Sequence, residues 1–107
     1  MSIIVLPISF HTSRTIPLSD LCRNLQYIQL KNMKQGLTQI SYEIYNEKDT
    51  LQTGTAIITP SLCNIPLSPF VKDPYHMFIA LRINAANPVP NTEEPFQLEL
   101  VLRIGKN

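Results

Sequence analysis

Charged residues are scarce in this chain of 107 residues, in which aspartate, glutamate, lysine and arginine together make up 16%. An average soluble domain carries roughly 25%. The formal net charge is only +1, so no global field steers the protein towards nucleic acid or a membrane surface. A small domain with so little charge is expected to hide part of its surface against a partner.

Tryptophan is absent and glycine occurs three times, whereas proline occurs nine times. The lack of tryptophan disfavours a carbohydrate site that depends on ring stacking, and the excess of proline favours a loop-rich β protein over a helical one. The hydrophobic fraction of 44% is ordinary for a globular protein and argues against disorder. The length predicts a single domain over residues 1–107 that can bury one core.

Cysteine occurs only at Cys22 and Cys63, and nothing in their spacing demands a disulfide, although one is possible. We expect two free thiols in a reducing compartment. The N-terminal apolar run is short, is broken by Pro7 and lacks the flanks of a signal peptide. No run approaches the roughly 20 apolar residues of a transmembrane helix. We therefore expect synthesis in the cytoplasm and no membrane partner.

The clearest pattern lies between Gly36 and Pro60 and predicts a β-hairpin. Apolar and polar residues alternate along its first arm, which places on one face Ile40, Tyr42 and Ile44. The polar stretch 46–50 predicts the turn. Gly54 in the return arm indicates a bulge or a close backbone approach. Pro60 should end the strand, because proline cannot donate to a ladder.

Four further segments alternate in the same way and predict strands at 3–10, 25–32, 75–84 and 96–104. The connecting segments are interpreted as a linker at 12–17, a short helical turn at 19–23, an irregular apolar crossover at 61–74 and a polar loop at 85–95. No βαβ alternation is present. The fold class is therefore all-β: a single antiparallel β-sandwich (jelly-roll or Ig-like Greek key), or a partly open β-barrel, of about 6–8 strands.

Residues that carry chemistry are isolated from one another in the sequence. The four nitrogen and sulfur ligands are His11, Cys22, Cys63 and His76, and none belongs to a paired motif such as C-x2-C. Asp73 and His76 lie three residues apart, but no nucleophile elbow accompanies them. We expect no metal, no cofactor and no enzymatic activity.

A weak pattern of single-strand nucleic-acid binders runs through the segment 21–42, which has no acidic residue. Its cations are Arg23, Lys31 and Lys34, and its tyrosines are Tyr27 and Tyr42. Three cations are few, and Tyr42 belongs to the predicted core face. A strand that carries lysines is more often an edge strand defended against aggregation. We therefore do not expect a nucleic-acid partner.

Several apolar residues lie where a monomer would have polar ones. The first strand is apolar on both faces near its start, yet Pro7 argues against a fully paired central position. A terminal strand covered by a neighbouring subunit reconciles the two observations. The candidate interface residues are Ile3, Val5, Tyr45, Phe70, Phe78 and Val101. If the strand residues among them gather, they form a patch, and such a patch favours a subunit interface.

These observations predict a structural function. We expect a non-enzymatic assembly subunit that packs against copies of itself or larger assembly proteins, such as a minor capsid, vertex or tail protein of a virus or phage particle. The alternative is a small β-sandwich binding module for a carbohydrate, a peptide or single-stranded nucleic acid. In that case the site should lie in the loops, where Phe70 is the main aromatic candidate.

Overall fold

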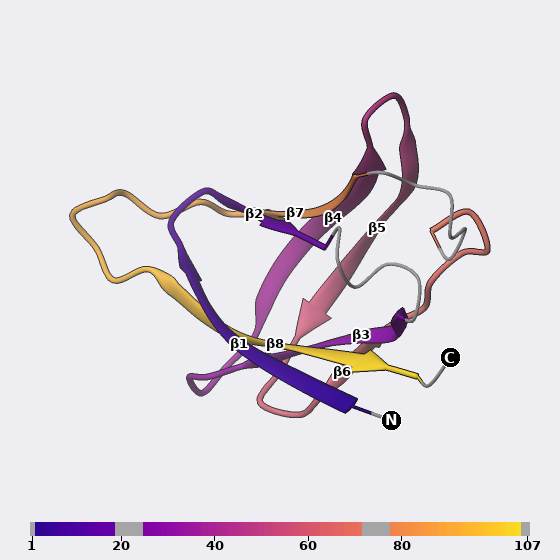
Figure 1. Cartoon of the computed structure of the whole chain (residues 1–107). Coiled ribbons are helices and arrows are strands. Elements are labelled where there is room, and N and C mark those ends of the chain that lie inside the picture. The colour runs from indigo at the N-terminus through magenta and orange to yellow at the C-terminus, as the bar shows by residue number, and fades with distance from the viewer. Residues whose placement is uncertain (1, 19–24, 72–77, 106–107) are drawn as a thin grey trace.

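The computed structural model describes residues 2–18, 25–71 and 78–105, which form eight β-strands in two layers (Figure 1). The strands are β1 (Ser2–Phe10), β2 (Ser13–Pro17), β3 (Leu25–Asn32), β4 (Thr38–Asn46), β5 (Thr50–Ile58), β6 (Cys63–Ile65), β7 (Ile79–Ala85) and β8 (Phe96–Ile104). No helix occurs in these ranges. One layer, sheet A, has the order β1-β8-β3-β6, and the other, sheet B, has the order β2-β7-β4-β5. The expected all-β sandwich is confirmed.

The strand order identifies the sandwich as a jelly roll. Antiparallel pairing joins β1 to β8, β2 to β7, β3 to β6 and β4 to β5, as if one long hairpin had been folded over twice into two four-stranded sheets. Further pairing of β3 with β8 and of β4 with β7 completes each sheet. An immunoglobulin-like order would divide the strands differently. The Ig-like and open-barrel alternatives are therefore wrong.

The core lies between the two sheets, because β1, β3, β4, β7 and β8 turn alternate apolar side chains inward. The inward-facing side chains with no more than 1% exposure on β3, β4, β7 and β8 are Ile28, Leu30, Ile40, Ile44, Ile79, Leu81, Ile83, Leu98, Leu100 and Leu102. Burial of one such side chain stabilises the fold by about 1.5–3 kcal/mol. The alternation that predicted the strands is thus the alternation that builds the core.

The hairpin expected between Gly36 and Pro60 is β4 and β5, and β5 ends before Pro60. Gly54 lies directly opposite Tyr42 in the ladder. A Cβ on Gly54 would lie 2.8 Å from Tyr42 Cε1, so the close approach expected at this glycine is confirmed. The ladder irregularity of the hairpin lies instead at Ile44 and Tyr45.

Two connecting segments contain strands that the sequence pattern did not indicate. The linker expected at 12–17 is wrong, because Ser13–Pro17 pairs with β7 as an edge strand of sheet B. The crossover expected at 61–74 contains β6, a three-residue edge of sheet A. The helical turn expected at 19–23 lies outside the described residues, as do the first residues of the strand expected at 75–84.

Candidate functional site

The outer face of sheet A brings together residues from four strands. Ile3 and Val5 project from β1 and lie opposite Arg103 and Val101 of β8. On the other side of β8, the register places Arg103 beside Tyr27 and Val101 beside Gln29 of β3. Because paired residues in neighbouring strands lie on the same face of a sheet, these side chains form continuous rows across sheet A.

The half of this face next to the β1 edge is apolar. We call it the apolar patch, and it consists of Ile3, Val5, Pro7 and Val101. Ile3 and Val5 are 52% and 50% exposed, whereas Val101 is 5% exposed although it points away from the core. The neighbouring side chains on the same face therefore already cover Val101. The open part of the patch is the β1 part.

The half of the face over β3 and β6 is polar and ordered. The Arg103 guanidinium donates through Nε to Gln29 Oε1 at 2.9 Å, and Gln29 Nε2 donates to Asn64 Oδ1 at 2.6 Å. The guanidinium also lies 5.5 Å from the centre of the Tyr27 ring, within the range of cation–π attraction. This network holds four side chains from three strands in place at the surface.

Two of the expected interface residues lie on the other layer. Tyr45 of β4 and Phe78, which precedes β7, pack with ring centres 6.2 Å apart. Arg82 lies over the Tyr45 ring at 5.1 Å. Ala80 lies opposite Tyr45 in the ladder and is fully buried although it belongs to the outer side of β7. The side chains of Tyr45, Phe78 and Arg82 thus form a local cluster on the outer face of sheet B.

The condition that these five residues gather in one patch is therefore not met. Ile3, Val5 and Val101 lie on the outer face of sheet A, whereas Tyr45 and Phe78 lie on sheet B. Phe70 lies in the segment after β6 and is 71% exposed.

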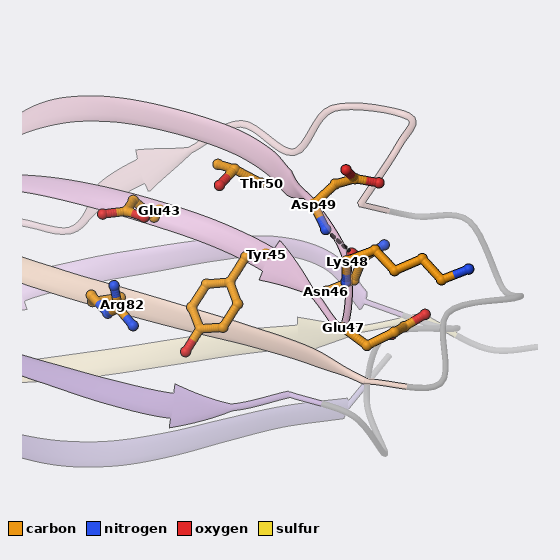
Figure 2. Close-up of a pocket in the computed structure, with 8 residues that line it drawn as sticks. All are labelled: Glu43, Tyr45, Asn46, Glu47, Lys48, Asp49, Thr50 and Arg82. Carbon is orange, nitrogen blue, oxygen red and sulfur yellow. Dashed lines mark hydrogen bonds between the residues drawn. The ribbon is translucent and has the colours of Figure 1, made fainter.

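An open polar pocket of about 230 Å³ lies at the turn end of the β4–β5 hairpin (Figure 2). It is lined by Glu43, Tyr45, Asn46, Glu47, Lys48, Asp49, Thr50 and Arg82. The Asn46 side chain holds the turn, because Asn46 Oδ1 accepts from the backbone N–H groups of Lys48 and Asp49 at 2.9 and 2.6 Å. Such a pocket can offer hydrogen bonds to a small polar ligand.

The candidate ligands for a metal are not brought together among the described residues, where no group of three or more His, Cys, Asp or Glu could hold an ion. His11 Nε2 donates to the Glu93 carbonyl at 3.0 Å and helps to hold the β7–β8 loop. Cys63 has a free, half-buried thiol. Cys22, Asp73 and His76 lie outside the described residues.

The basic residues of the nucleic-acid-binding pattern have different partners in the structure. Lys34 forms an ion pair with Glu94, and Lys31 lies opposite Glu99 in the ladder. Tyr42 is buried in the core, as expected, and Tyr27 lies against Arg103. Arg23 lies outside the described residues. Among the described members, Tyr27 and Lys31 share the outer side of β3, whereas Tyr42 faces the core.

Sequence reasoning missed the polar half of the sheet A face. Alternation along 25–32 and 96–104 places Tyr27, Gln29 and Arg103 on the sides away from the core, and that signal was available. The adjacency of β3 and β8 was not available, because it depends on the strand order.

The described residues contain no helix that is long and apolar enough to cross a membrane. No protein-family model matches the chain, and a search of curated proteins finds no significant match.

Proposed function

We propose that the protein is a non-enzymatic structural subunit of a large assembly and that it acts through protein–protein contacts on the outer face of sheet A. The particle of a virus or phage, with this chain as a minor capsid, vertex or tail protein, is the assembly that we favour. The observation that carries the proposal is the apolar patch, where Ile3 and Val5 are about half exposed at an edge of the sheet.

The composition of this face supports the proposal. Protein interfaces combine an apolar centre with aromatic residues and arginine, and are poor in lysine and acidic residues at the centre. Here Ile3, Val5 and Val101 adjoin Tyr27 and Arg103. The contacts between Arg103, Gln29 and Tyr27 hold the polar half in place before binding, which reduces the entropy lost when a partner docks.

The jelly roll adds a second, weaker argument. Viral capsid proteins use this fold, but lectins and cupins use it as well, and a fold by itself does not specify a function. The mechanism that we infer is burial of apolar surface, which contributes about 25 cal/mol per Å² removed from water. Burial of the exposed parts of Ile3 and Val5 provides such a contribution without any reactive group.

Size fractionation of a native extract from the source of the chain tests this function. We expect the chain to migrate with particles far larger than its own 12.2 kDa. A Val5→Lys variant should shift towards low mass, because a charge is then placed in the buried contact. The control is Ile57→Lys, which alters a residue of similar exposure, 54%, on sheet B. A wild-type chain found only at the mass of one or two copies contradicts the proposal.

A second candidate function is a binding module for a carbohydrate or peptide, and the pocket at the β4–β5 turn favours it (Figure 2). The pocket is smaller and more polar than the usual ligand site of roughly 300–1,000 Å³. One side of the Tyr45 ring is already covered by Arg82, which leaves less of the ring for stacking. We therefore rank this function second.

The second function is tested by titrating labelled protein with oligosaccharides and short peptides while NMR shifts are followed. Binding should shift the signals of Tyr45 and Arg82 and should be weakened by Glu43→Gln in the pocket. Glu99→Gln on sheet A is the matched control, because Glu99 lies opposite Pro7 and far from this turn in the topology. The absence of any saturable shift contradicts a binding module for the ligands tested.

A further inference from the structure

Four strands border the two sheets in the part of the chain that the structure describes, and they differ in how well they are protected. β2 and β6 are five and three residues long, and short edges offer few groups to a foreign strand. β5 is nine residues long and also uncharged, but its Gln52 side chain holds the segment after β6 beside the strand, through hydrogen bonds to the Pro66 carbonyl and the Ser68 N–H at 2.6 and 2.7 Å.

The strand β1 is protected along its free edge by Pro7, which lacks an N–H, but among the described residues neither by shortness nor by a segment bonded to it. It is nine residues long, contains no charged residue, and has β8 as its only described neighbour in the sheet. Soluble proteins usually place lysine or another charge on such an edge, because unpaired N–H and C=O groups otherwise accept a further strand. The long uncharged edge of β1 therefore indicates that a strand pairs with it in the functional state.

The charge pattern of β1 favours a second copy as that strand. In a pair of antiparallel strands related by a twofold axis, each side chain lies near the same residue of the second strand, or near a close neighbour of that residue. Any charged side chain in the strand would therefore lie near a like charge. β1 carries no charge over Ser2–Phe10, so antiparallel self-pairing meets no repulsion. Its outward residues Ile3 and Val5 then lie beside apolar residues of the copy.

Pro7 determines where such a pair can be centred. On an edge strand, proline lies where its missing N–H would face away from the neighbouring strand of the sheet. Residues two apart direct their backbone N–H and C=O groups to the same edge of the strand. The donors available to a second strand thus come from Ile3, Val5 and Ser9, and Pro7 supplies none. A twofold axis at Ile4 places Ile3 of each copy opposite Val5 of the other and leaves Pro7 outside these two central pairs.

We propose that two copies of this chain pair antiparallel through their β1 strands, about a twofold axis at Ile4, so that the two A sheets become one eight-stranded sheet. This inference rests on the proposed assembly function and specifies one of its contacts. A strand of nine residues is roughly 30 Å long, so the interface is small and the dimer should dissociate on dilution. The apolar patches of the two copies are then adjacent and form one larger docking face.

Sedimentation and light scattering of the purified chain over a dilution series test the dimer. We expect twice the chain mass of 12.2 kDa at high concentration and a single-chain mass at low concentration. Val5→Lys should abolish dimerisation at all concentrations, whereas Ile57→Lys on β5 should leave it unchanged. Isotope-filtered NMR of mixed labelled and unlabelled chain should show contacts between Ile3 methyl groups of one copy and Val5 methyl groups of the other.

Several alternative results overturn the inference, and one separates it from the assembly function. A wild-type chain that stays monomeric up to the highest concentration excludes the pair, as does a dimer that survives Val5→Lys. Loss of the dimer in Ile57→Lys as well indicates a head-to-tail contact between β1 and β5. A purified monomer together with large complexes in native extract would remove this contact and leave the assembly function intact. A purified dimer with no larger complexes in native extract would keep this contact and contradict the assembly function.

Discussion

Tyr42 lies across the backbone of Gly54, its direct partner in the β4–β5 ladder. The ring occupies the space that a Cβ on the glycine would need, with Tyr42 Cε1 only 2.8 Å from that position. Tyr42 is 7% exposed and belongs to the core, and its ring is thereby held between the two sheets. The glycine is required for this arrangement because it has no side chain, not because of its backbone angles.

Gly54→Ala should therefore destabilise the protein, because the added methyl group displaces a packed ring. The expected loss is about 1–3 kcal/mol, the usual cost of forcing extra atoms into a filled core, and urea denaturation measures it. The double variant with Tyr42→Leu should lose less than the sum of the two single changes, since the smaller side chain leaves room for the methyl. Equal stability of Gly54→Ala and wild type would contradict this account.

Asn32 is 5% exposed and holds the turn between β3 and β4 from inside. Its Nδ2 donates to Thr38 Oγ1 at 3.0 Å and to the Gly36 carbonyl at 3.3 Å, and its Oδ1 accepts from the Lys34 N–H at 3.2 Å. The turn needs Gly36, whose φ of 102° disfavours a side chain.

Asn32→Ala should cost about 1–3 kcal/mol in the free energy of unfolding, because it leaves polar groups of the turn without partners. Amide hydrogen exchange at Lys34 should accelerate, since its N–H loses its acceptor. Gln35→Ala is the matched control, because Gln35 lies in the same turn but is exposed. Unchanged exchange at Lys34 in Asn32→Ala would show that the turn does not depend on this side chain.

Val5 and Val101 are cross-strand partners on one face but differ tenfold in exposure, at 50% and 5%. The same substitution should therefore have two outcomes. Val101→Thr buries a hydroxyl and should cost about 1–3 kcal/mol, whereas Val5→Thr should remain within about 0.5 kcal/mol of wild type. Thermal or urea unfolding of the monomer distinguishes them. Similar costs at both sites would mean that Val101 is not covered by its neighbours.

The Lys34 ammonium lies 2.7 Å from Glu94 Oε2 and lowers the pKa of Glu94 from its ordinary value of 4.5, first through the hydrogen bond and then through charge attraction. Because the folded pKa lies below the unfolded one, the pair's stabilisation is present above the unfolded pKa and is lost as the pH falls through the folded pKa. The contribution to stability is small, since the Glu94 side chain is 86% exposed.

Lys34→Met should raise the pKa of Glu94 towards 4.5, which an NMR titration of the Glu94 carboxyl carbon measures directly. Lys48→Met removes the same charge from the β4–β5 turn and serves as the control, because Lys48 lines the pocket of Figure 2 rather than the Glu94 site. A pKa of Glu94 that is unchanged in Lys34→Met, or raised equally in Lys48→Met, would remove the ion pair as its cause.

The sequence by itself determined the long strands and the core. Alternation over 25–32, 40–45 and 96–104 identified β3, β4 and β8, because successive side chains of an extended chain necessarily point to opposite faces. β2 could not be found in this way, since only Ile16 of its five residues is buried. It forms a strand because β7 offers it a ladder.

Only the tertiary structure decided which faces meet. Alternation assigned Val5, Val101 and Tyr45 to outer faces but did not reveal that the two valines share sheet A while Tyr45 belongs to sheet B. That distinction depends on strand order, and ladder pairing between residues as distant as Ser2 and Ile104 establishes the order. Local patterning has a range of a few residues, so the jelly roll and its apolar patch exist only once the whole chain has paired.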